Sequence, residues 1–172
     1  MSKKILMLLA SENFRDIEYI APRAFFEKAG IEIKTASSTK TSTGRFGYSV
    51  QNDWLVQDVK AEDFDGIYLV GGGGSMEYMD NEFAKKLCTS FLKSNKPIGA
   101  ICMAPRNFLH WDFLKGKKAT GWNDDQGFSK MANEVGAVDH SEKPVVVDGW
   151  ILTANGPEAS EESAIEFMKL LK

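Results

Sequence analysis

Apolar strand-like runs alternate along this chain with longer segments whose apolar residues recur at helical spacing, and this alternation restricts the fold more than any other feature. "KILMLLA", "FDGIYLV" and "KPIGAI" are typical of strands that are covered on both faces. "NEFAKKLCTSFLKS" places its apolar residues on one side of a helix. Strands that alternate with helices usually pair in parallel. The pattern therefore predicts an α/β fold with a mostly parallel sheet and helices on both faces.

Local signals place the remaining elements. We expect a strand at "IEIKTAS", a hairpin or edge excursion within "GRFGYSVQNDWLVQDV", a short strand at "KATGW" and a helix at "QGFSKMANEVGA". "VVVDGWILTA" predicts a hairpin that turns at Asp148 and Gly149, and a helix follows it to the end of the chain. The first helix ends near Gly30 and contains Pro22, which should distort it or mark a restart.

Composition and charge exclude several classes of protein. The 172 residues suit one domain over residues 1–172, and 43% are hydrophobic. The net charge is −3 and no stretch concentrates Lys and Arg, which argues against a nucleic-acid partner. The apolar run at residues 5–9 is too short to span a membrane and lacks a cleavage-like end, so we interpret it as a strand of a cytoplasmic protein. Two cysteines make no disulfide framework, and no Cys/His spacing suggests a metal site.

Four loops follow the predicted strands, and ligands of such folds bind at the carboxyl ends of the strands. These loops are "ASENFRDIE", the glycine run "GGGGS", the turn at Cys102 and "ANGPEAS". The glycine run lacks the spacing of a nucleotide-binding loop. It is either a flexible turn or a set of free backbone amides that can face an anion. The second interpretation is favoured only where a nucleophile lies beside it.

Cys102 lies where a buried strand changes directly into a helix. A strand, a nucleophile and a helix in this order form a nucleophile elbow, in which a sharp turn forces the side chain outward. The start of a helix also favours the thiolate form of a cysteine. The alternative is an unreactive core thiol, and we accept that interpretation for Cys88, which lies on the apolar side of a helix.

The chain resembles the ThiJ/PfpI family, also called the DJ/PfpI family, over nearly its whole length. The resemblance is carried, in the family's order, by "FRDIE", "FDGIYLVGGGGSMEYM", "IGAICMAP", "LKGKKATGW" and "EKPVVVDGWILTANGP". It implies a flavodoxin-like three-layer sandwich and a homodimer or higher homo-oligomer. It also implies a small-molecule carbonyl or a peptide as substrate.

The same resemblance implies roles for particular residues. The family's nucleophilic cysteine falls on Cys102, and the glutamate that touches its sulfur falls on Glu18. The glycines whose amides form the oxyanion site fall on Gly72 and Gly73, and the amide that follows the cysteine joins them. In the peptidase-like branch an acid reaches the site of the neighbouring subunit, and Glu77 matches it.

The residue after the cysteine departs from the pattern of many members. They carry a histidine there, whereas this chain has Met103, whose backbone amide is the one that joins the oxyanion site. His110 is two helical turns away, roughly 12 Å along the helix axis, and cannot reach back. His140 is best interpreted as a solvated loop residue. Trp122 and Asn123 fall near the place where some members bring a further polar or histidine side chain.

Glu18 is therefore the remaining candidate for moving protons at the thiol. Burial should raise its pKa, so we expect it to hold a proton and to donate a hydrogen bond to a Cys102 thiolate. Alternatively, Glu18 is only an N-terminal helix carboxylate that interacts with the helix dipole.

The resemblance leaves three functions open. In glyoxalase or deglycase chemistry, Cys102 adds to a reactive carbonyl such as methylglyoxal, the amides stabilise the oxyanion and Glu18 moves the proton, without a metal or organic cofactor. In a stress-response oxidation sensor, Cys102 is oxidised to sulfenate or sulfinate without turnover. The third function is a cysteine peptidase, which Met103 disfavours because attack on an amide needs a base and later an acid.

Overall fold

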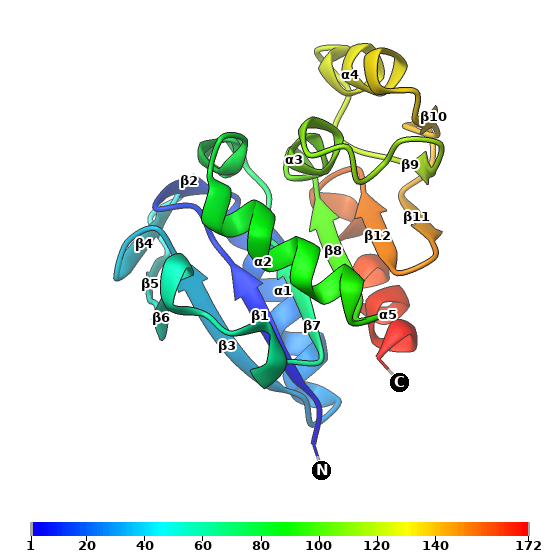
Figure 1. Ribbon diagram of the computed structural model, residues 1–172. Helices are drawn as coiled ribbons and strands as arrows, with labels where there is room; N and C mark the ends of the chain where they lie inside the picture. The colour runs from blue at the N-terminus through cyan, green and yellow to red at the C-terminus, as the bar shows by residue number, and fades with distance from the viewer. Residues whose placement is uncertain (1, 172) are drawn as a thin grey trace.

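The computed structural model describes residues 2–171 and is built around one seven-stranded sheet (Figure 1). In spatial order the strands are β11 (Val145–Asp148), β12 (Ile151–Ala154), β8 (Ile98–Ile101), β7 (Gly66–Leu69), β1 (Lys4–Leu8), β3 (Glu32–Ser37) and β6 (Trp54–Leu55). The edge strand β11 runs antiparallel to β12, and every other pair is parallel. The predicted mostly parallel sheet is confirmed.

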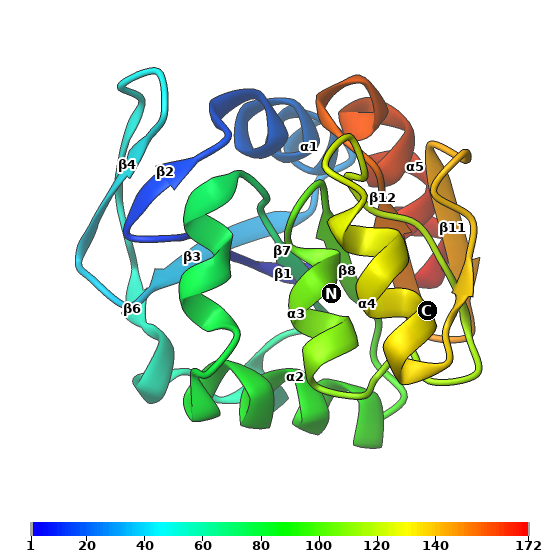
Figure 2. The same ribbon diagram turned by 90° about the horizontal axis from the view of Figure 1, so that it is seen from above.

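Helices cover both faces of this sheet and complete the three layers, which are clearest from above (Figure 2). On one face lie α1 (Asp16–Lys28) and α5 (Ser160–Leu170), and on the other lie α2 (Glu82–Lys93) and α3 (Pro105–His110). The helix α4 (Gly127–Val135) packs beside α3, away from the centre of the sheet. The flavodoxin-like sandwich is therefore confirmed.

The central strand β1 shows why its apolar run is continuous. Ile5 and Met7 enter the core that packs against α1 and α5, whereas Leu6 and Leu8 enter the core on the side of α2 and α3. All four side chains are buried. Successive residues of a strand point to opposite faces, so a strand between two helical layers needs apolar residues at every position.

Two smaller sheets lie outside the main one. One contains β2 (Glu12–Phe14), β4 (Thr41–Gly44) and β5 (Ser49–Gln51), and the other contains β9 (Lys118–Ala119) and β10 (Val138–Asp139). Short 3₁₀ turns complete the chain: η1 (Val56–Asp58), η2 (Ala61–Asp63), η3 (Gly73–Tyr78) and η4 (Pro157–Ala159). The two strand pieces within "GRFGYSVQNDWLVQDV" are β5 and β6, which do not pair with each other: β5 forms a hairpin with β4, which lies almost entirely before this segment, and β6 is an edge strand beside β3. The strand expected at "KATGW" is only two residues long and pairs with β10.

The first helix corrects one expectation. α1 runs without interruption through Pro22, so there is no restart at this residue. A proline inside a helix costs about 3 kcal/mol. Burial of a large apolar side chain contributes about 1.5–3 kcal/mol, and Tyr19 and Phe26 on the same helix are both buried. Packing of the helix therefore outweighs the missing hydrogen bond.

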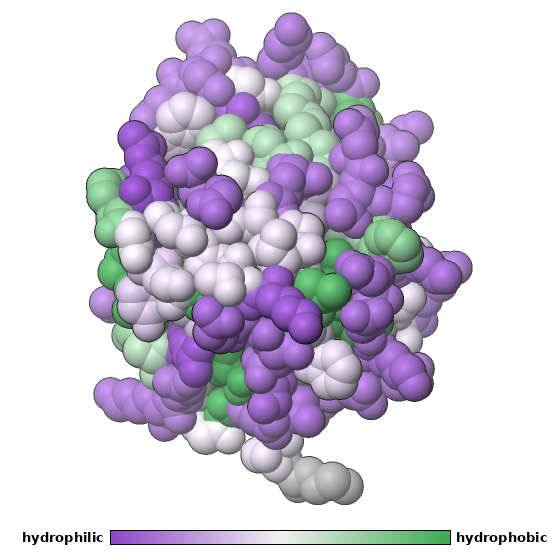
Figure 3. Space-filling view, turned by 90° about the vertical axis from the view of Figure 1, so that its left-hand side faces the viewer, coloured by the Kyte–Doolittle hydropathy of each residue, from purple (hydrophilic) through white to green (hydrophobic). Residues whose placement is uncertain are grey.

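The face that carries the edge strand β6 and the β4–β5 hairpin is largely hydrophilic (Figure 3). Green, hydrophobic residues reach it in small groups that are separated by purple and white ones. Within residues 2–171, no helix combines the length and the apolar character needed to cross a bilayer.

Gly99 in β8 gives a test of how tightly the core is packed. A Cβ at this position would lie 2.9 Å from ring carbons of both Tyr68 and Phe167, whose rings meet edge to face. We expect Gly99→Ala to reduce the free energy of unfolding by about 1–3 kcal/mol, because overpacking forces the rings apart. Urea denaturation, monitored by circular dichroism, measures the free energy of unfolding of each variant. Gly73→Ala is the matched control, since nothing lies within 4 Å of its added Cβ. Equal stability of the two variants would contradict the packing described.

Candidate active site

The order of the strands determines where the site lies. β1 is followed along the chain by β3 on one side of it, whereas β7 and β8 lie on its other side. The order therefore reverses between β1 and β7, and ligands of such sheets bind in the crevice beyond the strands at this point. The segments after β1, β7 and β8 carry Glu18, the glycine run and Cys102 to the upper edge in Figure 1.

Cys102 stands on a sharp turn directly after β8. Its φ angle is 62°, in the left-handed region that side chains other than glycine rarely adopt. Its backbone N–H donates to the carbonyl of Ala154 at 2.8 Å, and its carbonyl accepts from the N–H of Trp122 at 2.8 Å. These bonds hold the turn from both sides, and α3 begins three residues later at Pro105. The turn is the elbow that the sequence predicts.

Two backbone amides face the sulfur of Cys102. The N–H groups of Gly72 and Met103 interact with it and act to lower the pKa of the thiol. Gly72 has a φ angle of 97°, and a Cβ there would lie 2.4 Å from the backbone nitrogen of Arg15. Only glycine fits this conformation and this approach. Gly73 lines the same pocket.

Gly71 brings the glutamate and the cysteine together. A Cβ on this residue would lie 2.3 Å from Oε2 of Glu18, 2.3 Å from the carbonyl oxygen of Ile101 and 2.7 Å from Cβ of Cys102. Both side chains therefore pack around one residue that has no side chain of its own. Sequence reasoning singled out Gly72 and Gly73 and missed Gly71, although it belongs to the same glycine run.

Glu18 lies on the first turn of α1 and is fully buried. Burial raises the pKa of its carboxyl to about 8. The interaction with the Cys102 thiol and the charge of Arg15 lower this pKa, and the charge of Glu158 raises it. Neither carboxyl oxygen makes a well-formed hydrogen bond within the described chain, so the contact with the thiol has imperfect geometry. Glu18 therefore holds a proton at neutral pH, in agreement with the expectation.

The thiol of Cys102 differs from the expectation. Its pKa is raised to about 12, mainly by burial and then by the charge of Glu18 and a hydrogen bond with it. A helix N-terminus favours a thiolate, but here burial and a neighbouring carboxylate outweigh that effect and the two amide donors. A carboxylate beside a thiolate would be two like charges with little water. The two groups therefore titrate as a pair, which loses its first proton near pH 8.

These groups line one pocket of about 250 Å³. Besides Glu18, Gly72, Gly73, Cys102 and Met103, its walls contain Trp122 and three residues that sequence reasoning did not assign to the site: Arg15, Arg45 and Pro157. A larger surface cavity of about 630 Å³ lies between η1, η2 and α2, but its lining contains neither cysteine nor histidine. The smaller pocket is therefore the candidate active site.

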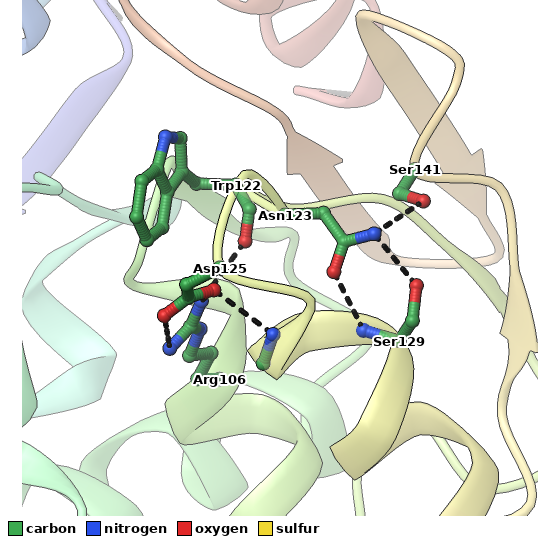
Figure 4. Close-up of polar contacts among 7 residues, drawn as sticks. Arg106, Trp122, Asn123, Asp125, Ser129 and Ser141 are labelled. Carbon is green, nitrogen blue, oxygen red and sulfur yellow. Dashed lines mark hydrogen bonds and ion pairs between the residues drawn. The ribbon is translucent and has the colours of Figure 1, made fainter.

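Arg106 on α3 holds the loop that carries Trp122 (Figure 4). Its guanidinium donates to the carbonyl of Trp122 at 3.1 Å and pairs with Asp125 at 2.5 Å. Asn123 extends to the opposite side, where its amide donates to Ser129 at 2.7 Å. Of the two residues that the resemblance placed near the site, Trp122 lines the pocket and Asn123 does not.

The remaining candidate residues lie outside the pocket. His110 contacts Asp80 at 3.0 Å and His140 contacts Glu142 at 3.0 Å, so neither imidazole reaches Cys102. Glu77 accepts hydrogen bonds from the hydroxyls of two serines of its own chain, Ser11 and Ser38, each at 2.7 Å. No group of three or more metal-ligating side chains gathers within residues 2–171.

The fold and the site together define a class of α/β proteins in which a parallel sheet carries a cysteine on a nucleophile elbow at its carboxyl edge. A family model described as the DJ-1/PfpI family matches residues 3–170. The chain belongs to this family.

Individual relatives agree with this assignment. The deglycase PfpI of Pyrococcus furiosus is 35% identical over 173 residues, which cover 98% of this chain and 99% of the relative. A ThiJ/PfpI domain protein from Brachyspira murdochii has a solved structure that matches with a TM-score of 0.92 at 29% identity, over 99% of this chain and 96% of that one. DJ-1beta of Drosophila melanogaster matches with a TM-score of 0.87 at 25% identity, over 99% of this chain and 91% of that one.

The two cysteines should differ in reactivity. Cys88 lies on the buried side of α2, where complete burial strongly raises its pKa, whereas Cys102 opens into the pocket. We expect iodoacetamide to modify Cys102 first in the folded protein, because the reagent needs access as well as thiolate. Peptide mass mapping after partial labelling identifies the modified residue. Labelling of Cys88 ahead of Cys102 would overturn the choice of nucleophile.

Replacement of Glu18 tests whether its carboxylate influences the pKa of the Cys102 thiol. Glu18→Gln removes the charge that raises the pKa of Cys102, so we expect this pKa to fall and alkylation to become faster in alkaline solution. A fall of about one unit would increase the thiolate fraction roughly tenfold. The pH dependence of Cys102 alkylation measures the change, with Glu162→Gln on the exposed side of α5 as control. Superimposable profiles for native protein and Glu18→Gln would show that Glu18 does not act on the sulfur.

Proposed function

We propose that this protein is a cytoplasmic enzyme with glyoxalase- or deglycase-type activity on small reactive carbonyl compounds. The observation that carries the proposal is the Cys102–Glu18 pair, which shares a small pocket with two backbone amides directed at the sulfur. A relative at 35% identity is named a deglycase, which supports this class of chemistry.

The first step is addition of the Cys102 thiol to an aldehyde carbon. The sulfur–carbon bond forms, the carbonyl π bond breaks, and the thiol proton passes through Glu18 to the carbonyl oxygen. The N–H groups of Gly72 and Met103 lie beside the sulfur and so beside the oxygen that gains negative charge during addition. When the carbonyl compound has already added to an amine as a hemiaminal, the sulfur–carbon bond forms as the carbon–nitrogen bond breaks, and the thiol proton passes through Glu18 to the leaving amine.

Glu18 then performs the second proton transfer. For a 2-oxoaldehyde, its carboxylate removes the proton from the carbon bound to sulfur and returns it to the neighbouring carbonyl carbon, while the hydroxyl proton of the first carbon passes to the oxygen of the second. One carbon is oxidised as its neighbour is reduced, so no external oxidant is needed. Water cleaves the resulting thioester, which releases a 2-hydroxy acid and restores the Cys102 thiol.

The two other functions are less well supported. An oxidation sensor needs no substrate pocket, whereas Cys102 opens into a pocket of about 250 Å³. A peptidase needs a base that can also return a proton to the leaving amine, and neither imidazole lines the pocket.

A homodimer in which Glu77 reaches the partner's pocket also remains part of the proposal. The carboxylate of Glu77 would have to exchange its hydrogen bonds with Ser11 and Ser38 for contacts across that interface.

The proposal is tested by turnover of methylglyoxal to lactate as a function of pH. We expect the rate to rise as the pH increases through about 8, because the active pair has lost one proton. Cys102→Ser should abolish turnover, and Glu18→Gln should reduce it by roughly 10²–10⁴-fold, the usual contribution of a general acid–base.

Cys88→Ser is the matched control and should retain activity, since Cys88 lies in the core away from the pocket. Absence of turnover by native protein with both methylglyoxal and a methylglyoxal-modified amine would refute the proposal. Hydrolysis of casein that depends on Cys102 would favour the peptidase instead.

A further inference from the structure

The four arginines of this chain fall into two groups. Arg23 pairs with Glu27 and Arg106 pairs with Asp125. The other two, Arg15 and Arg45, both line the Cys102 pocket, and neither forms an ion pair with a carboxylate in the described part of the chain. A guanidinium is always charged and presents several N–H donors, so two unpaired ones in a pocket indicate a place for an anion.

Arg15 provides the stronger evidence. Its Nε is buried without a hydrogen-bond partner within residues 2–171. A buried donor that remains unpaired costs about 1–3 kcal/mol, and more when it is charged. Such groups are uncommon unless a ligand completes them. The Arg15 backbone is fixed by its N–H bond to the carbonyl of Gly71 at 2.9 Å, so the side chain begins next to the glycine run.

The ring of Phe46 lies beside the guanidinium groups of both arginines. The Arg15 guanidinium lies 4.9 Å from the centre of its ring, and the Arg45 guanidinium lies 5.9 Å from it. Arg15 precedes α1, whereas Arg45 lies in the turn of the β4–β5 hairpin. The hairpin therefore contributes a second positive charge to a pocket that is built mainly from the main sheet.

Two carboxylates lie near the arginines without pairing with them, since Asp16 accepts hydrogen bonds from the backbone N–H groups of Phe46 and Tyr48. Glu18 holds a proton at neutral pH because burial raises its pKa to about 8. Glu158 influences Glu18 through its charge, but it is exposed and forms no ion pair with either arginine. The pocket thus combines a neutral thiol, a neutral carboxyl and two cations.

We propose that Arg15 and Arg45 bind the anionic group of the substrate, a carboxylate or a phosphate, while its carbonyl carbon reaches Cys102. The proposal rests on the proposed function only for the identity of the reacting group, a carbonyl. The planar fork of a guanidinium matches two oxygens of either anion. A substrate of this class is a small aldehyde or ketone with a carboxylate or phosphate close to its carbonyl group.

Alkylation with two reagents of similar size tests the anion site without any need for turnover. Iodoacetate carries a carboxylate, iodoacetamide is neutral, and both react with the same thiol. We expect Arg15→Gln to lower the iodoacetate-to-iodoacetamide rate ratio at Cys102 by about tenfold, because one charge-assisted hydrogen bond is lost. Arg45→Gln should lower it by about threefold, since Arg45 is exposed and water screens its charge.

Lys28→Gln is the matched control, since it removes one positive charge from the exposed end of α1 and should leave the ratio unchanged. Protection experiments distinguish the two anions. Stronger slowing of iodoacetate by inorganic phosphate than by acetate supports a phosphate-bearing substrate, and the reverse supports a carboxylate.

Equal rate ratios in native protein and both arginine variants, or protection by neither anion, would overturn the anion site. Turnover of methylglyoxal that depends on Cys102 would then still support the proposed function, because methylglyoxal carries no charge. If Arg15→Gln fails to fold, the exposed Arg45→Gln and the protection experiments still decide the question.

Discussion

The close packing of Glu18 and Cys102 around Gly71 is the contact on which the rest of the site depends. Any side chain at residue 71 would overlap Oε2 of Glu18 and the carbonyl oxygen of Ile101, both 2.3 Å from where its Cβ would lie. Loss of that contact would separate α1 from the turn after β8 and remove the proposed proton-transfer partner of the thiol. One glycine thus links three segments that are far apart in the sequence.

Burial at this contact determines the charge state of the site. It raises the pKa of both Glu18 and Cys102, so the pair is neutral in neutral solution and two anions never face each other there. The same burial leaves the Nε of Arg15 and both carboxyl oxygens of Glu18 without well-formed partners in the described chain. Unpaired polar groups lower the stability of a fold, and their concentration in one pocket is typical of a functional site.

The sequence predicted much of this site, because the catalytic candidates lie in segments that directly follow buried strands. Cys102 follows "PIGAI" and Gly72 follows "FDGIYLV", and the resemblance to a family added Glu18. Arg45 could not be found in this way, since it lies in a hairpin of a separate sheet. The pKa of Cys102 was also missed. Position on a helix suggests a thiolate, but burial and the approach of Glu18 depend on how distant segments pack.

The sequence by itself determined the α/β architecture and the elbow, because hydrophobic periodicity and the strand–cysteine–helix order act over a few neighbouring residues. Only the tertiary structure decided that α1 continues through Pro22 and that the guanidinium groups of Arg15 and Arg45 both lie beside the ring of Phe46. It alone also showed that Trp122 lines the pocket while Asn123 points away. These features depend on contacts between segments that are distant along the chain. Their energies come from burial and packing, which local sequence patterns do not specify.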